Sequence, residues 1–300
     1  MDLTDPDAVV RALLDGAEAN RAASCRRGAI DLIEPPGTLI ATGDLHDNPV
    51  HYEAVLRVAG LDGDAPAPSE ALGGEPVHLT LHEIIHSERL MHGVDLSYRV
   101  LVKVAALKAR CPERVHTLIA NHELAQLNGS AIVKNGVKMV RAFSDGIDYA
   151  FGDDAHNVEL AVRDFIRSMP LGLRCRTPMG DILCCHSLPG VQAMGKFDTS
   201  VLHRELTEDD YAPRTGPIHM MTWGRGYDPD QIEDLVARWG VRLFILGHEH
   251  AHEGARVVPP AAVVLNSDHD RGVYLPIDLS DPPGLLECPD RVCPLSAVVV

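Results

Sequence analysis

Apolar and polar residues follow one another along the first part of the chain in the order typical of alternating helices and strands. Residues 5–25 carry apolar side chains at helical spacing behind a Thr4/Asp5 capping signal, which predicts a covering helix. Residues 37–42 form a short apolar run that ends at a Gly-Asp turn, and residues 51–59 again show helical spacing. This order predicts a strand that leads into a helix.

The same alternation continues toward the centre of the chain. Strands are predicted at 77–81 and 115–120, and a helix is predicted between them at about 96–110. Segment 61–76 is rich in Pro, Gly and Ala and longer than most connections, so we expect a loop that is either mobile or functional. Strands that alternate with helices predict an α/β fold.

The pattern changes in the second half of the chain. Residues 136–168 show apolar stripes at helical spacing, and we expect them to form a helical cap beside the functional site. From residue 171 onward, short apolar runs typical of strands dominate, and one helix is predicted among them. We therefore expect two packed mixed β-sheets flanked by helices. The predicted strands are 171–176, 181–185, 242–246, 262–265 and 272–277, and the helix is 230–239.

Composition limits the classes of protein to consider. Of the 300 residues 45% are hydrophobic and no shift in composition divides them, which predicts one domain over 1–280 and a peripheral Pro-rich tail at 281–300. The 27 Lys and Arg against 43 Asp and Glu give a net charge of −16, which argues against nucleic acid or a membrane surface as a partner. Without the features of a signal peptide or a membrane span, the chain is expected to be soluble and cytoplasmic.

Four short polar segments rich in His, Asn and carboxylates each follow a predicted strand, and they are the candidate chemistry. Because open α/β sheets place their sites at the carboxyl ends of strands, we expect these segments to converge. Residues two apart, such as Asp44 and His46 or His248 and His250, project to the same side of an extended segment. Imidazole and carboxylate ligands suit Mn, Fe or Zn, so a site for two divalent ions is predicted. The segments are 43–48 (GDLHDN), 120–123 (ANHE), 185–187 (CHS) and 247–250 (GHEH).

In this order the segments resemble the calcineurin-like metallophosphoesterases, and within them the serine/threonine protein phosphatase branch. That family carries the blocks GDxH, GDxxDRG, GNHE, a lone His after a strand, and GHxH. The resemblance implies the four-layer metallophosphoesterase sandwich, with a first metal held by Asp44, His46 and His250. It implies a second metal held by three further residues, Asn121, His186 and His248.

The resemblance also implies residues that face the substrate. His122 would bind the phosphate or protonate the leaving oxygen rather than hold a metal. Segments around Arg204 and Arg225 are similar to the stretch that supplies a phosphate-binding Arg in protein phosphatases. The phosphorylated substrate, a phosphoprotein or a small phosphate ester, is the partner that the resemblance implies.

The second block of the family is altered in this chain. Where the family has GDxxDRG, residues 82–86 read HEIIH. Glu83 takes the place of the Asp that bridges both ions, and His86 takes the place of the Asp that orients the catalytic His. If the preceding strand runs on to residue 85, Glu88 becomes the bridge instead. The phosphate-clamping Arg of this block has no counterpart in register, because Arg89 is displaced from its position.

The sequence therefore predicts a metal-dependent phosphoesterase that cleaves phosphate monoesters with a hydroxide bridging two ions, with phosphoserine or phosphothreonine proteins as the first substrates to test. His122 would assist departure of the alcohol. Three alternatives stay open: a dinucleoside polyphosphate hydrolase, a catalytically impaired homologue that binds metal, and a zinc protease, because HEIIH is also a literal HExxH. The sequence does not define the oligomeric state.

Overall fold

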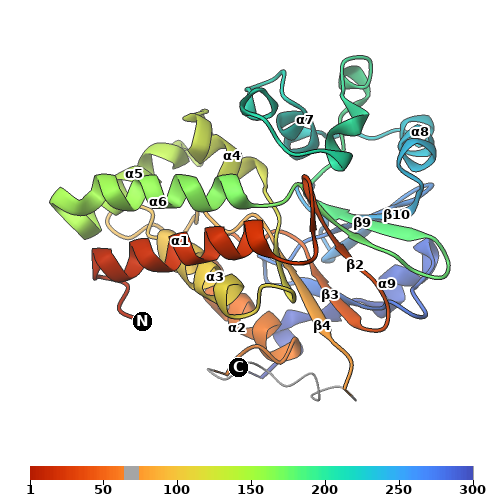
Figure 1. Cartoon of the computed structure of the whole chain (residues 1–300), viewed down its shortest axis with the longest axis horizontal. Helices are drawn as coiled ribbons and strands as arrows, with labels where there is room; N and C mark the ends of the chain where they lie inside the picture. Colours follow the sequence, from red (N-terminus) through yellow and green to blue (C-terminus); the bar gives the residue numbers. More distant parts are fainter. Residues whose placement is uncertain (64–73, 300) are drawn as a thin grey trace.

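The computed structural model of the chain describes residues 1–63 and 74–299, and its strands form two large mixed sheets and a hairpin (Figure 1). The seven-stranded sheet has the order β1 (Arg26–Arg27), β2 (Ile30–Ile33), β8 (Gly172–Cys175), β9 (Asp181–Cys185), β10 (Val241–Leu246), β12 (Ala262–Leu265) and β11 (Ala255–Val258). The five-stranded sheet has the order β14 (Cys293–Pro294), β13 (Val273–Asp278), β3 (Thr38–Thr42), β4 (Val77–Leu81) and β5 (Val115–Thr117). The hairpin pairs β6 (Val133–Lys134) with β7 (Val137–Lys138).

Helices cover the outer faces of the two sheets. In Figure 1 the helices α1, α3, α5 and α6 lie to one side of the strands, α8 lies beside β10, and α7 lies above the strands near α4. The arrangement gives the layers helix, sheet, sheet and helix, which confirms the predicted fold class. The helices are α1 (Pro6–Ala22), α2 (Pro49–Val58), α3 (Tyr98–Arg110), α4 (Asn121–Asn128), α5 (Met139–Phe151), α6 (Ala155–Ser168), α7 (Pro217–Trp223), α8 (Pro229–Trp239) and α9 (Cys288–Arg291).

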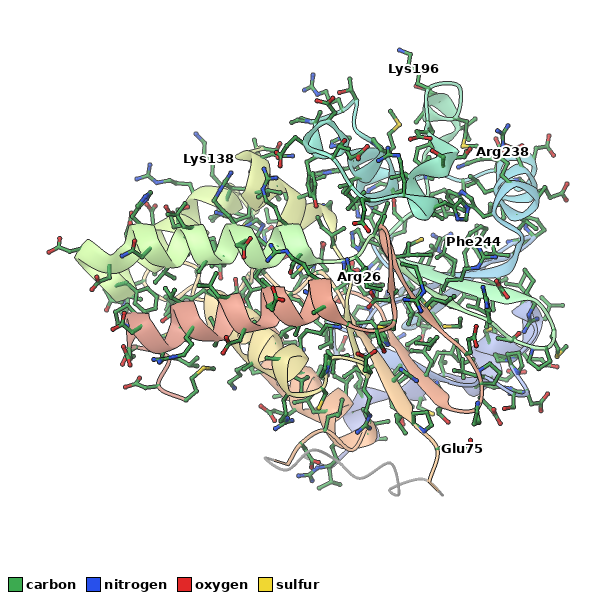
Figure 2. The ribbon with its side chains drawn as sticks, in the orientation of Figure 1. Arg26, Glu75, Lys138, Lys196, Arg238 and Phe244 are labelled. Carbon is green, nitrogen blue, oxygen red and sulfur yellow. The ribbon has the colours of Figure 1, made fainter. Side chains whose placement is uncertain are left out.

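The space between the sheets is filled by alternate apolar side chains of the facing strands. Leu39 of β3 and Leu275 of β13 pack in one cluster with Leu243 of β10, and each is fully buried. A larger cluster lies between the sheets and the outer helices. Figure 2 shows the contrast with the surface, since Lys138, Lys196 and Arg238 project outward whereas Phe244 lies inside. Burial on both faces explains why these strands are nearly continuous apolar runs.

Register places the carboxyl ends of the central strands at a common edge. β3, β4 and β5 are parallel neighbours in one sheet, and β9, β10 and β12 are parallel neighbours in the other. Asp44, just after β3, forms a parallel bridge with Asn266, just after β12, so the two sheets meet at this edge. The polar segments of the sequence are therefore brought to one place.

Several predicted boundaries differ from the observed ones. The strand predicted over 115–120 ends at Thr117, because the backbone N–H of Ile119 turns to the carbonyl of Pro170. Of the predicted loop 61–76, residues 64–73 lie outside the described part. Strand β14 and the buried residue Leu295 join residues 281–299 to the five-stranded sheet, although this segment was expected to be peripheral.

Residues 136–168 fold largely as predicted into two helices, α5 and α6, preceded by the end of the small hairpin. Helix α6 packs along α1, and α5 reaches the site region through Phe143, whose ring lies 5.8 Å from that of His86. A role as a cap stays a prediction. In the described part of the chain no helix has both the length and the apolar character needed to cross a membrane.

Candidate metal centre

Backbone hydrogen bonds hold the strand-end segments together. The backbone N–H groups of Leu45 and His46 both donate to the carbonyl of Glu83, at 3.3 and 2.7 Å, which ties the loop after β3 to the loop after β4. The carboxylate of Glu123 is buried in α4 and accepts from the backbone N–H groups of Ile84 and Ile85, at 2.7 and 3.2 Å. These bonds fix residues 82–86 as an irregular loop rather than a helix.

Two glycines are required by the close approach of these loops. A Cβ on Gly43 would lie 2.0 Å from the carbonyl oxygen of Leu265, and a Cβ on Gly247 would lie 2.3 Å from Oδ1 of Asp44. Both distances are far below van der Waals contact, so any side chain would push the segments apart. The Gly of GDLH and the Gly of GHEH therefore have a packing reason in this chain.

Positive backbone φ angles are concentrated in the same loops. Such angles in residues other than Gly cost about 1 to 3 kcal/mol each and gather at functional sites, where the surrounding structure enforces them. Each one turns a side chain away from the direction that strand periodicity would give it. The residues are His46 (42°), Asp47 (55°), Glu83 (52°), His86 (65°) and His248 (66°).

The carboxylate of Glu83 lies at the centre of the assembled side chains. Its Oε1 is 3.4 Å from Nε2 of His46 and 3.4 Å from Nε2 of His122. Its Oε2 is 3.4 Å from Nε2 of His186. One buried carboxylate thus faces a different set of nitrogen atoms with each oxygen, which is the geometry expected of a bridging ligand.

On the Oε2 side, Asn121 completes the set. Its Oδ1 lies 2.7 Å from Nε2 of His186 and 3.1 Å from Nδ1 of His248. Two atoms that each lie about 2.1 Å from one ion are about 3.0 to 3.4 Å apart at octahedral or tetrahedral angles. The spacings of 3.1 Å to His248 and of 3.4 Å between His186 and Glu83 therefore fit the edges of a coordination shell, whereas the 2.7 Å contact is shorter. The mix of imidazole, amide and carboxylate suits Mn, Fe or Zn.

Asp44 and His250, predicted with His46 for the first metal, have their nearest contacts with other residues. The carboxylate of Asp44 accepts from the backbone N–H of His248 at 3.0 Å and lies 3.5 Å from Nδ1 of His186. His250 is exposed, and its ring lies against those of His252 and His269, at 6.0 and 5.7 Å between centroids. Both residues line the cavity, but the structure does not group them with His46.

Three residues near the site were missed or assigned only by position. His82 stands where the family pattern has Gly. It is buried, and its Nδ1 lies 3.1 Å from Nδ1 of His186. Lys134 of the small hairpin places its Nζ 3.2 Å from Nε2 of His46. In the sequence pattern Glu123 is only the last residue of its block. The HExxH pattern marks His82 in the sequence, whereas no spacing marks Lys134.

Two other predicted residues lie apart from the donors. Glu88 is largely exposed and faces Lys134 and Asn135, at 3.8 and 3.1 Å, so its position does not support a bridging role. The guanidinium of Arg204 is paired with Asp198 and Asp210, at 2.8 and 2.6 Å. These two carboxylates occupy the N–H groups of Arg204, and Arg204 lines neither the cavity at Glu83 nor the one at Trp223. The structure therefore does not place Arg204 for phosphate binding.

Burial sets the electrostatics of the centre. It raises the pKa of Asp44 to about 7, although the backbone N–H of His248 opposes the shift. Burial, then the charges of Asp44 and Glu123, raise the pKa of Glu83 well above its ordinary value. Burial also lowers the pKa of the ring of His186 far below its usual value. Neutral imidazoles around buried carboxylates whose pKa values are raised are a donor set that a divalent cation would stabilise.

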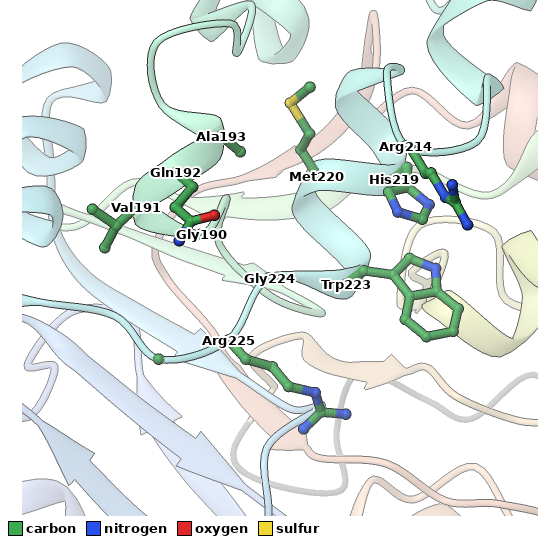
Figure 3. A pocket seen from close by; sticks show the side chains of 11 residues that line it. Gly190, Val191, Gln192, Ala193, Arg214, His219, Met220, Trp223, Gly224 and Arg225 are labelled. Atoms are coloured by element: carbon green, nitrogen blue, oxygen red, sulfur yellow. The ribbon is translucent and has the colours of Figure 1, made fainter.

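Most of the donors, His186 excepted, line a cavity of about 350 Å³, and a second cavity of about 450 Å³ lies beside it. Arg225 lines both, and its Nη1 donates to the carbonyl of His248 at 3.0 Å. Figure 3 shows Arg225 extending from the loop after α7, with Trp223 and His219 beside it on that helix. The rings of Trp223 and His219 stack at 5.6 Å, and the Trp223 ring lies 6.3 Å from that of His248.

Similar folds occur among solved phosphatase structures. A Saccharomyces cerevisiae protein serine/threonine phosphatase, described as similar to a human phosphatase, superposes with a TM-score of 0.66 at 15% identity, covering 91% of this chain and 83% of that one. A cold-active protein-tyrosine phosphatase from a Shewanella species gives a TM-score of 0.56 at 13% identity, covering 87% and 79%. At these identities the likeness establishes the fold. No curated protein sequence matches this chain.

The sequence itself carries the family assignment. The sequence model of calcineurin-like phosphoesterases matches residues 37–252, which include all the strand-end segments described above. The match covers most of the chain and agrees with the two-sheet architecture and with the grouped metal-ligand side chains. The chain therefore belongs to the calcineurin-like phosphoesterase family.

Proposed function

We propose that this protein hydrolyses phosphate monoesters at a dinuclear metal centre bridged by Glu83. The observation that carries the proposal is the position of the Glu83 carboxylate, whose two oxygens face His46 and His186 at 3.4 Å each. One ion would lie on the Oε1 side, and the other would lie on the Oε2 side with Asn121 and His248. Bound divalent ions would activate water and neutralise charge on the phosphoryl oxygens.

Residues of the chain provide the binding site for the phosphate group. Arg225 is exposed, and its Nη1 donates to the His248 carbonyl, so its remaining N–H groups can donate to a phosphate. Lys134 brings a second positive charge into the same cavity. These two cations create a local attraction for an anion on a protein whose net charge is −16.

The neighbouring cavity supports a substrate larger than inorganic phosphate. Because Arg225 lines both cavities, a phosphate at the metal centre would leave its alcohol portion beside Trp223 and His219. The fold neighbours are named as serine/threonine and tyrosine phosphatases. We therefore place phosphoprotein side chains first among the substrates and dinucleoside tetraphosphates second.

Turnover tests the proposal directly. The metal-free protein is reconstituted with Mn²⁺, Fe²⁺ or Zn²⁺ and assayed with p-nitrophenyl phosphate, phosphoserine and phosphotyrosine peptides, and diadenosine tetraphosphate. We expect two bound equivalents of metal and hydrolysis of monoesters, with at least about a hundredfold loss in Asn121→Ala. Bound metal without turnover of any phosphate ester would favour the impaired homologue, and absence of bound metal would refute the proposed centre.

The zinc protease alternative is not supported by the geometry of residues 82–86. A zincin site needs a helix that turns both His side chains toward one ion. Here the segment is an irregular loop, and its two His rings face different partners, His186 and His122. Casein incubated with the zinc-loaded protein should therefore stay intact.

A further inference from the structure

The cavity of about 450 Å³ beside the metal centre differs in charge from the other cavities of the protein. Arg214 and Arg225 line it, and no Asp or Glu is among the described residues that do so. Four other cavities of about 350 to 450 Å³ in the described part of the chain each include at least one carboxylate. In a chain with 43 Asp and Glu against 27 Lys and Arg, this cavity is therefore a local region of positive charge.

The two Arg of this cavity differ in what they can reach. Arg225 also lines the cavity of the metal centre and donates to the carbonyl of His248, so it belongs to the phosphate that is cleaved. Arg214 lines only the larger cavity, is exposed, and forms no ion pair with a carboxylate of the described residues. In the view of Figure 3, the ring of Trp223 lies between the side chains of Arg214 and Arg225. Arg214 is therefore available for a second negative charge on the substrate.

The loop that carries Arg214 is held in place by its neighbours. The backbone N–H of Gly216 donates to the carbonyl of Ala212 at 2.9 Å, which closes a turn around Arg214. A Cβ on Gly216 would lie 2.2 Å from the carbonyl oxygen of Asp210, so the turn packs directly on that residue. The carboxylate of Asp210 is in turn paired with Arg204 at 2.6 Å. Arg214 itself has a φ of 67°, an unfavourable conformation for a residue with a side chain, which the surrounding turn enforces.

The wall of the cavity near Arg214 is formed by stacked rings. The ring of His219 lies 5.6 Å from that of Trp223 with an angle of 22° between the planes. Burial, then the charge of Arg214, lower the pKa of His219, so this ring is neutral at pH 7 and the guanidinium of Arg214 carries the charge at this end of the cavity. A substrate that extends from the metal centre would thus pass the ring of Trp223 and meet a cation beyond it.

We propose that this cavity selects phosphoserine and phosphothreonine residues with a negatively charged neighbour in the peptide, and that Arg214 binds this second charge. The proposal rests on the proposed function, because it names the substrate class of that same site. The second charge is the carboxylate of Asp or Glu, or another phosphate group, since a guanidinium donates paired N–H groups to either. Arg214 would also offset the repulsion between an acidic peptide and a protein whose net charge is −16.

Phosphoserine peptides of equal length test the proposal with the metal-reconstituted protein. The residue beside the phosphoserine is Glu, a second phosphoserine, Gln or Lys, and kcat/KM is measured for each peptide. We expect a preference of about three- to tenfold for an anionic neighbour over Gln, expressed mainly in KM and reduced at about 0.5 M NaCl. A preference for either anion supports the proposal and identifies the source of the charge. Equal kcat/KM values for all four peptides would overturn it.

Variants of Arg214 assign the preference to this residue. Arg214→Gln should remove it, Arg214→Lys should keep most of it, and Arg214→Glu should reverse it in favour of the Lys peptide. Lys196→Gln is the matched control, because Lys196 projects outward and does not line the cavity. Thermal unfolding verifies that each variant is folded. If the Arg214 variants keep the preference of the unaltered protein, or alter only the hydrolysis of diadenosine tetraphosphate, the proposal is wrong.

Binding without turnover separates this proposal from the proposed function. Labelled peptides in which a phosphonate replaces the phosphoserine phosphate cannot be hydrolysed, and fluorescence anisotropy measures their affinity. If the protein hydrolyses no phosphate ester but binds the Glu peptide more tightly than the Gln peptide, and Arg214→Gln abolishes the difference, the proposed function fails and the anion site stands. If all peptides are hydrolysed and bound equally well, the proposed function stands and the role of Arg214 is refuted.

Discussion

Two buried clusters in this protein combine histidine pairs with a carboxylate, and they differ in where the compensating positive charge comes from. In the metal centre, the rings of His122 and His186 surround Glu83, and among the residues that the structure describes no Arg or Lys lies within ion-pair distance of this carboxylate. In the second cluster, His78, His116 and Asp31 lie between β4, β5 and β2, and Arg26 pairs with Asp31 at 2.8 Å. Arg26 is labelled in Figure 2.

The pKa values of the two carboxylates diverge accordingly. Burial raises the pKa of Glu83 well above its ordinary value, and nearby carboxylates add to the shift. Burial acts in the same direction on Asp31, but the hydrogen bond and charge of His116, with the charge of Arg26, outweigh it and lower the pKa to about 2.

The second cluster also groups potential metal ligands, because one ligand atom from each of Cys25, Asp31 and His116 lies within 4.8 Å of the other two. Their atoms are already engaged, because Arg26 Nε and His116 Nδ1 each contact one oxygen of Asp31 at 2.8 Å. Burial raises the pKa of the Cys25 thiol to about 12, so it stays protonated and is a poor ligand. The comparison indicates that a grouping of metal-ligand residues points to a metal where no Arg or Lys of the described residues forms an ion pair with its central carboxylate.

The largest effect is expected when the central carboxylate of the metal centre is neutralised. Glu83→Gln removes the bridge, so we expect phosphatase turnover to disappear and metal affinity to fall by more than the roughly 100-fold typical of losing a supporting residue. Metal content by elemental analysis and turnover of p-nitrophenyl phosphate measure this. Retention of both ions in Glu83→Gln would contradict the bridging role.

Removal of the internal cation should break the second cluster. Arg26→Met leaves Asp31 fully buried with only His116, and a buried charge that loses its partner costs about 3 to 5 kcal/mol. Urea unfolding measures the loss, and Arg26→Met/Asp31→Asn should recover part of it. Metal affinity should be unchanged in both variants. A loss in stability below about 0.5 kcal/mol would show that Arg26 is not needed to compensate Asp31.

Addition of metal should stabilise the protein through the first cluster alone. At a free ion concentration of 100 times the dissociation constant, binding to the folded state adds about 2.7 kcal/mol per site. Thermal unfolding with and without Mn²⁺ or Zn²⁺ gives the shift. We expect Asn121→Ala to reduce it and Cys25→Ala to leave it unchanged, whereas loss of the shift in Cys25→Ala would place a metal in the second cluster.

Acid should affect the two clusters over different ranges of pH. The folded-state pKa of Asp44 is raised to about 7, so below that pH this carboxyl, 3.5 Å from Nδ1 of His186, holds a proton that a cation bound beside it would displace. Apparent metal affinity should therefore fall as pH drops below 7, by about tenfold per pH unit for each proton displaced, which corresponds to about 1.4 kcal/mol. Titration calorimetry in buffers of different ionisation enthalpy measures the released protons. Affinity that is constant from pH 7 to 5.5 would contradict this.

The opposite sign applies to Asp31. Its folded-state pKa of about 2 lies below the ordinary value of 3.8, so its contribution to stability is present above pH 3.8 and is lost as pH falls toward 2. Acid unfolding of Asp31→Asn should lack this contribution. If both proteins lose stability equally over that range, the pKa of Asp31 is not depressed.

The smallest effect is expected for Glu88→Gln. Glu88 is exposed, and surface substitutions of this kind usually change stability by less than about 0.5 kcal/mol. Turnover and metal content should stay within about twofold of those of the unaltered protein. A large loss in this variant, together with little effect of Glu83→Gln, would transfer the bridging role to Glu88.

The sequence was sufficient for the parts of this protein that depend on local pattern. Periodicity predicted most strands and helices, and 77–81, 181–185 and 262–265 match the observed strands to the residue. The order of the polar segments gave the family and identified Glu83 and Asn121 as residues to examine. The edge strand β1 was missed, because a strand of two residues has too few positions to show a period.

The arrangement of side chains at the site was decided by the tertiary structure. Alternation along a strand predicted that Asp44 and His46 share one ion, but His46 and His248 adopt positive φ angles that turn their side chains out of that pattern. The carboxylate of Asp44 instead meets the backbone of His248, 204 residues later in the chain. Sequence specifies which donors stand at the strand ends, because that depends on local order. Which atoms face one another depends on contacts between distant segments, and no local pattern encodes them.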